Sequence, residues 1–149
     1  MVAFMFSPEI AVAFLLLITK VFAFMEMNFD KRSTVVFDMD GTRSPEEQKI
    51  IHEYYLPIRA LVLLLIPTAA DMQEFWPWLA LVGVAVTYFW IVFDIMCAVF
   101  WLGKPWWYVG EPPPFGINPK MFFIIKGILF ALCMFIYFRL TNEFNYLLA

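Results

Sequence analysis

The stretch WPWLALVGVAVTYFWIVFDIMCAVFWLG, residues Trp76–Gly103, decides the fold of this chain. It is apolar almost throughout, and it is longer than the about 20 residues that a helix needs to cross a bilayer. Its one ionisable residue is Asp94. A carboxylate at such a depth costs about 2.5 kcal/mol or more unless it faces protein or water. The stretch therefore predicts a membrane-spanning helix in which Asp94 needs a partner.

The composition of the whole chain is also that of a membrane protein. Of its 149 residues, 63% are hydrophobic and 15% are charged, whereas a soluble domain is about half apolar and about a quarter charged. A chain of this length cannot bury so much apolar surface in a water-soluble core. The net charge of −3 and the lack of a basic run beyond Lys31–Arg32 argue against a nucleic-acid partner.

Three more apolar stretches bring the number of predicted membrane-spanning helices to four. The predicted spans are residues 9–28, 50–70, 76–103 and 119–140. Residues 29–49 are a polar connector, in which the β-branched patch Ser33–Phe37 favours a short extended segment. Residues 104–118 are a loop rich in proline and tryptophan, which suits the membrane interface. We treat residues 1–149 as a single membrane domain.

The charges in the loops predict the orientation. The lysine and arginine residues of the loops lie in or beside the first and third loops, whereas the second loop has only the acidic Asp71 and Glu74. These basic residues are Lys31, Arg32, Arg43, Lys49, Lys104 and Lys120. The positive-inside rule then places the first and third loops in the cytoplasm. The predicted fold is an all-α integral membrane protein, an up-down bundle of four transmembrane helices with both termini on the outer side. The expected location is a bacterial inner membrane or a membrane derived from it, with an organelle membrane as the alternative.

Each predicted span brings an ionisable side chain to a similar depth. At 1.5 Å per residue, these side chains lie about 10–14 Å from the cytoplasmic ends of their helices. The four residues are Lys20, Arg59, Asp94 and Lys126. We expect them to form an intramembrane charged layer in which they satisfy one another. Two interpretations remain open: an ion-pair cluster that fixes the order of the helices, and a site for an anion, a lipid headgroup or a proton.

The third loop is a candidate surface for docking a partner. Its aromatic and proline side chains offer a rigid surface of the kind that protein partners bind. The residues concerned are Trp106, Trp107, Tyr108, Pro113 and Phe115.

The segment Val35–Thr42, VVFDMDGT, resembles the first motif of haloacid-dehalogenase-type phosphatases, in which a hydrophobic strand leads into Asp-x-Asp-Gly-Thr. The resemblance implies that Asp38 would be the phosphoryl nucleophile and Asp40 the general acid/base, both helping to hold magnesium. That family needs an α/β domain around the strand, but a membrane helix follows here. We therefore interpret the match as coincidental and Asp38–Gly41 as a turn.

No nucleophile–base pair, metal-ligand set or phosphate loop is found in the sequence. In size, number of spans and position of its termini, the chain is similar to the small membrane enzymes that conjugate glutathione to lipids, but no site residue follows from that likeness. We expect no catalytic, cofactor-binding or metal site. The predicted function is that of a non-enzymatic structural or accessory subunit of a membrane complex or virion membrane. The alternative is a small oligomeric transporter or channel subunit that uses the charged layer. The expected partners are the lipid bilayer and other membrane subunits or further copies of the chain.

Overall fold

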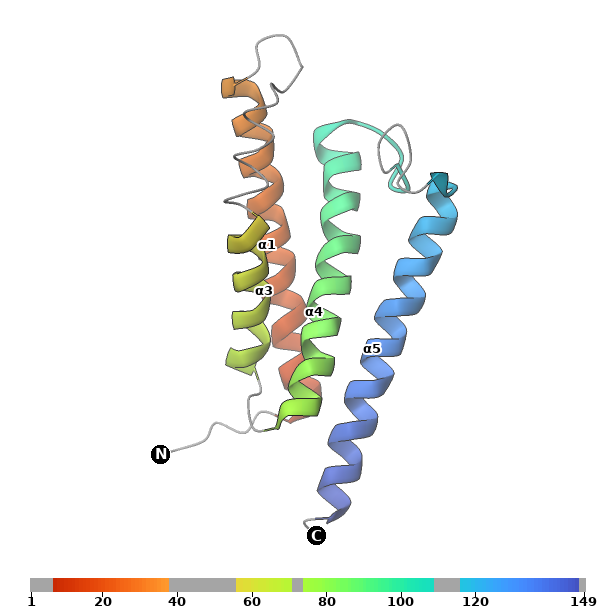
Figure 1. The fold of residues 1–149 in the computed structure, drawn as a ribbon. Helices are drawn as coiled ribbons and strands as arrows, with labels where there is room; N and C mark the ends of the chain where they lie inside the picture. The colour runs from red at the N-terminus through yellow and green to blue at the C-terminus, as the bar shows by residue number, and fades with distance from the viewer. Residues whose placement is uncertain (1–6, 38–55, 71–73, 109–115, 148–149) are drawn as a thin grey trace.

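The computed structural model describes residues 7–37, 56–70, 74–108 and 116–147, and the regular structure in these ranges is helical (Figure 1). The elements are α1 (Pro8–Phe37), α3 (Leu56–Ala70), α4 (Phe75–Met96), the π-helical turn η2 (Cys97–Trp101) and α5 (Pro119–Leu147). Described helices that follow one another along the chain run in opposite directions, and α1 begins at the end of the bundle where α5 ends (Figure 1).

Three helices of the described chain are long and apolar enough to cross a membrane. These stretches are Pro8–Asn28, Phe75–Trp101 and Pro119–Thr141, whereas the apolar part of α3, Pro57–Ala69, is shorter. The prediction of a helical membrane protein is thereby confirmed. The prediction that the chain crosses the bilayer four times, and the orientation inferred from the loop charges, remain predictions.

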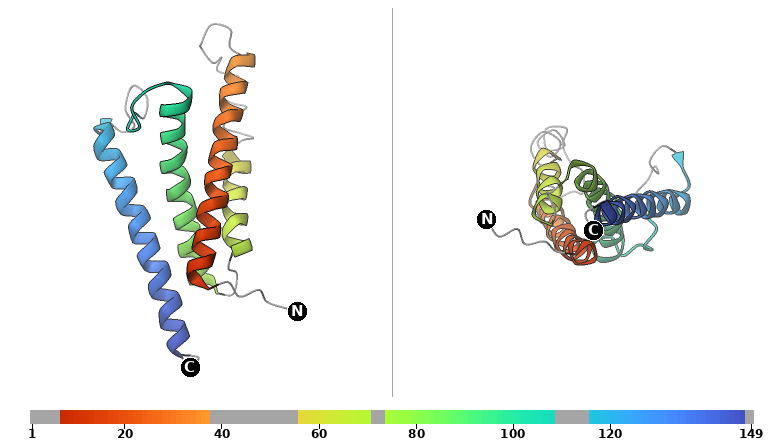
Figure 2. Two further views of the ribbon diagram at one scale, coloured as in Figure 1. Left: turned by 180° about the vertical axis from the view of Figure 1, so that it is seen from behind. Right: turned by 90° about the horizontal axis from the view of Figure 1, so that it is seen from below.

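Helix α4 is the centre of the bundle. Helices α1, α3 and α5 all pack against it, and α1 also packs against α3. Helix α5 slants away from α4 toward its own N-terminal end, which both side views show (Figures 1 and 2). The α4–α5 interface is therefore tight at one end of the bundle and wider at the other.

The core follows this arrangement in two clusters. The first draws on all four helices, and its fully buried members include Leu15, Leu81, Val84 and Tyr137. The second contains Ala23, Met27, Leu63, Phe89 and Met96, which come from α1, α3 and α4. Helix α5 supplies none of the buried residues of the second cluster, but its Phe122 and Phe123 are buried, and the Phe122 ring contacts that of Trp90 of α4, with centroids 5.3 Å apart.

Gly83 allows the close approach of α4 and α5 at the tight end. A Cβ atom at this position would lie 2.9 Å from Cys133 Sγ, which is nearer than packed side chains approach. Small residues at such crossings let membrane helices pack backbone to backbone.

Two helix ends differ from the expected bounds. Helix α1 continues to Phe37, so residues 29–37 of the expected polar connector are helical, and Ser33–Phe37 is not extended. The reason is that no proline or glycine interrupts the chain between Pro8 and Gly41, so the helix continues past its apolar part. Helix α5 likewise continues beyond the expected end at residue 140.

The phosphatase-like motif falls partly on helix α1. Val35–Phe37, which would be the strand of such a motif, are the last residues of that helix. Asp38 to Gly41 and the start of the second predicted span at residue 50 lie outside the described residues.

Candidate functional site

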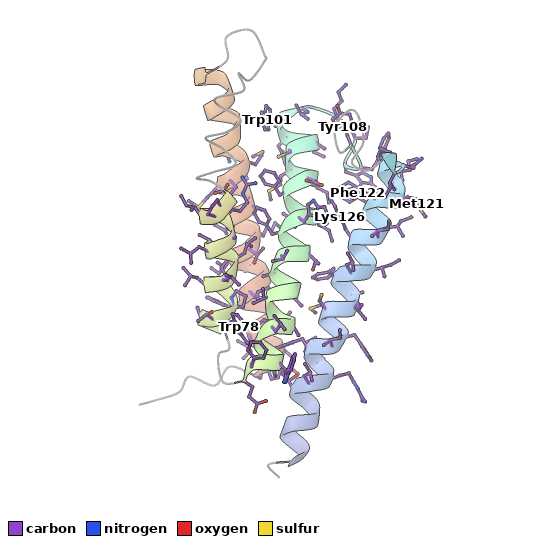
Figure 3. All side chains as sticks on the ribbon, viewed as in Figure 1. Trp78, Trp101, Tyr108, Met121, Phe122 and Lys126 are labelled. Atoms are coloured by element: carbon purple, nitrogen blue, oxygen red, sulfur yellow. The ribbon has the colours of Figure 1, made fainter. Side chains whose placement is uncertain are left out.

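The Asp94 and Lys126 side chains form an ion pair between α4 and α5. The Lys126 ammonium donates a hydrogen bond to Asp94 Oδ2, and Figure 3 shows Lys126 between the two helices. The Lys126 side chain is 1% exposed, whereas that of Asp94 is 22% exposed. The pair lies on the part of α5 that has slanted away from α4, where it connects the two helices together with the contact between the Trp90 and Phe122 rings.

Aromatic rings surround the rest of the Lys126 ammonium. The Nζ atom lies 4.3 Å from the ring centroid of Trp90, 4.4 Å from that of Phe122 and 5.0 Å from that of Phe123. The electron-rich faces of such rings attract a cation, and the attraction is stronger where water is excluded. One carboxylate and three rings thus take the place of water around this charge.

A second ion pair joins α1 and α3 on another side of α4. The Nη2 and Nε atoms of Arg59 donate hydrogen bonds to Glu26 Oε2 at 2.7 and 3.1 Å. The Arg59 guanidinium also lies 4.9 Å from the Phe93 ring centroid and 5.7 Å from that of Phe89. Because these two rings belong to α4, this cation holds three helices together.

The structure therefore divides the four residues of the expected charged layer. It brings Asp94 and Lys126 together, and it pairs Arg59 with Glu26. Lys20 is exposed on the outside of α1. Glu26 is not one of these four residues, because it lies near the far end of the predicted span 9–28 and not at the depth of the expected layer.

The described part of the third loop packs against the start of α5. Trp106 meets Phe123 edge to face, with ring centroids 5.4 Å apart. The Lys120 ammonium lies 5.2 Å from the Trp107 ring, and the Lys104 ammonium lies 5.7 Å from the Tyr108 ring. The other two residues of the expected docking surface, Pro113 and Phe115, lie outside the described residues.

An open cavity of about 610 Å³ lies between α4, α5 and this loop. Its lining is apolar except for one lysine, and consists of Ile91, Ile95, Trp106, Trp107, Lys120, Phe123, Ile124 and Gly127. We call it the α4–α5 groove.

Comparison with known proteins identifies no relative of this chain. Searches against protein-family models, curated proteins and solved structures found no match for this chain. Within the described ranges, no three His, Cys, Asp or Glu side chains gather in a way that could hold a metal ion.

Replacing Arg59 with lysine should destabilise the protein although the charge is kept. Lysine cannot form both hydrogen bonds to Glu26 from a planar group, and it loses the contact of the guanidinium with the Phe93 ring. The expected loss is about 1–2 kcal/mol of unfolding free energy, measured by denaturant titration in detergent. Lys20→Arg, on the exposed face of α1, is the matched control and should change little. Equal stability of the two variants would show that the Glu26–Arg59 geometry does not contribute.

Proposed function

We propose that this protein is a non-enzymatic structural or accessory subunit of a larger membrane assembly, in which the outer face of α1 contacts a partner helix. Lys20 is the observation that carries the proposal. It lies inside the apolar stretch Pro8–Asn28, and its side chain is exposed on the outside of the bundle. A charge at this depth is costly unless it meets protein or water, so a partner at this face would remove the cost.

The direction of the Lys20 side chain supports a protein partner over the lipid headgroups. The nearer end of the apolar stretch is Asn28, about 12 Å along the helix axis at 1.5 Å per residue. Side chains leave a helix pointing toward its N-terminus, so Lys20 is directed away from that nearer end. Reaching the headgroups by snorkelling would therefore require the long route toward Pro8.

The surroundings of Lys20 fit a second membrane helix. Leu17, Val21 and Phe24 are large, apolar and exposed next to it along α1. A partner helix with an Asp or Glu at the same depth would cover these side chains and neutralise the ammonium. The partner is then another membrane subunit or another copy of this chain.

The two internal ion pairs agree with a structural role. Each joins two helices, and the Lys126 ammonium is enclosed by its carboxylate and three rings. The alternative, a transporter or channel subunit, would need these cations to face a path for ions or solutes. The enclosure of Lys126 favours the structural role.

Replacing Lys20 with leucine should separate the protein from its assembly while leaving its own fold intact. Leucine keeps apolar contact with a partner helix but removes the charge that a partner carboxylate would meet, and that carboxylate would then be left unpaired. We expect native mass spectrometry of gently extracted protein to show the partner chain, or a second copy, on the wild type and not on Lys20→Leu.

Lys104→Leu is the control, because Lys104 is an exposed lysine outside the apolar stretches. It should retain the partner. Two results would contradict the proposal: a wild-type protein that is extracted as a lone monomer, or a Lys20→Leu variant that keeps its partner as well as the control does.

A further inference from the structure

The α4–α5 groove has the form of a binding site that reaches from the membrane interface into the bilayer. Lys120 and Trp107 stand at one end of its lining and Gly127 at the other. Lys120 is at the start of the apolar stretch Pro119–Thr141, and Gly127 lies about 10 Å further along the helix axis. The groove volume of about 610 Å³ is within the range of about 300–1,000 Å³ that small-molecule sites occupy.

We propose that this groove binds an acyl chain of an anionic membrane lipid, with the lipid phosphate beside Lys120. The proposal is independent of the subunit role, since the groove lies on α4 and α5 and the partner face lies on α1.

The apolar part of the groove suits an acyl chain. Ile91 and Ile95 line it from α4, and Ile124 lines it from α5. The α5 wall lacks a side chain at Gly127, where an added Cβ would meet nothing within 4 Å. An empty apolar space loses the dispersion contacts that its lining would otherwise make. In a bilayer the flexible apolar molecule at hand to fill it is a lipid tail.

The polar end of the groove suits an anionic headgroup. The Lys120 ammonium lies 5.2 Å from the Trp107 ring centroid, so the charge is positioned at the groove. Lys120 is also in the first turn of α5, where the helix dipole favours a negative charge. Tryptophan rings are common at the level of the headgroups. By the loop charges this end faces the cytoplasm, where anionic lipids attract basic residues.

The arrangement of α4 and α5 explains why a lipid would bind here and not at the other end of their interface. At Gly83 the two helices are in contact, since a Cβ there would press on Cys133. Toward the N-terminal end of α5 the same helices have diverged, and the Asp94–Lys126 pair bridges them. The groove is the space that this divergence leaves beside the pair.

Replacing Gly127 with leucine tests the proposal by filling the groove. The new side chain has open space at its Cβ, and leucine favours a helix more than glycine does, so the variant should fold. We expect its affinity for phosphatidylglycerol, titrated onto the delipidated protein and followed by native mass spectrometry, to fall about tenfold or more because buried methylene contacts are lost. Ala131→Leu is the matched control, since Ala131 is exposed one turn further along α5 and does not line the groove.

A second pair of measurements tests the headgroup. Lys120→Met should bind phosphatidylglycerol and phosphatidylcholine of the same chain length equally, whereas the wild type should prefer phosphatidylglycerol. The Ile124→Phe variant narrows the groove from another position and should also lower the affinity for phosphatidylglycerol. It keeps the proposal testable if Gly127→Leu fails to fold. The proposal is overturned if both filling variants bind phosphatidylglycerol like the Ala131→Leu control, or if inorganic phosphate displaces the lipid as well as a second lipid does.

Discussion

Asp94→Asn should lower the unfolding free energy by about 3–5 kcal/mol, the loss found when one partner of a buried ion pair is removed. The substitution leaves the Lys126 ammonium charged, 1% exposed and without its carboxylate. The rings of Trp90, Phe122 and Phe123 attract the cation but cannot neutralise it. Since this ion pair joins α5 to α4, we expect α5 to separate first. The loss of unfolding free energy is measured by titration with a denaturing detergent, with the helix content monitored by circular dichroism.

The reverse substitution, Lys126→Met, should be milder. It leaves Asp94 without its partner, but that carboxylate is 22% exposed and keeps part of its access to polar surroundings. Removing both charges in an Asp94→Leu/Lys126→Met double variant should recover much of the stability, because an apolar pair of similar size avoids the desolvation of two ions. A double variant no more stable than Asp94→Asn would contradict this account. An Asp94→Asn variant that keeps wild-type stability but loses solute flux would favour the transporter alternative instead.

Gly83→Leu should be the second large effect, because it forces α4 and α5 apart at the tight end. Even a Cβ at this position would lie 2.9 Å from Cys133 Sγ, and leucine adds three more carbon atoms beyond it. Overpacking of this kind costs about 1–3 kcal/mol, and we expect the upper part of that range because two helices must move. Thermal unfolding in detergent, together with the rate of proteolysis of α5, measures the change.

The control for this prediction changes Cys133, whose Sγ atom an added Cβ at Gly83 would contact. Gly83→Ala presses only on Cys133 Sγ, so Cys133→Ala in the same chain should relieve most of its effect. Cys133→Ala in the wild type should change stability little by comparison. If Cys133→Ala does not rescue Gly83→Ala, the penalty arises elsewhere than in the α4–α5 contact.

The positions of the long helices could be predicted from the sequence because an apolar run of this length in a bilayer forms a helix. The start of α4 at Phe75 is one residue from the expected Trp76, and α5 begins at the expected Pro119, with its Lys120 N–H donating to the Asn118 side chain at 3.0 Å. The C-terminal ends of α1 and α5 could not be predicted in this way. A helix that leaves the apolar region continues until a helix-breaking residue or a capping interaction ends it. The composition of the chain alone does not locate that residue.

The pairing of the charged residues could be predicted only in part. Counting residues gives the depth of a side chain in the membrane, and this count predicts that Asp94 and Lys126 lie at a similar depth. It does not give the face of the helix, and the face separates Lys20, which is exposed, from Glu26, which reaches Arg59. The α4–α5 groove had no sequence signal either, because it depends on the angle between two helices and on the missing side chain at Gly127.

The two ion pairs have the same order along the chain. In each, the carboxylate comes first and the cation follows on the next described helix, 33 residues later for Glu26 and Arg59 and 32 residues later for Asp94 and Lys126. During synthesis, each acidic helix is therefore made before the basic helix that neutralises it. Helices α1 and α3, and then α4 and α5, are therefore two successive pairs along the described chain, and each pair contains its own acid and base.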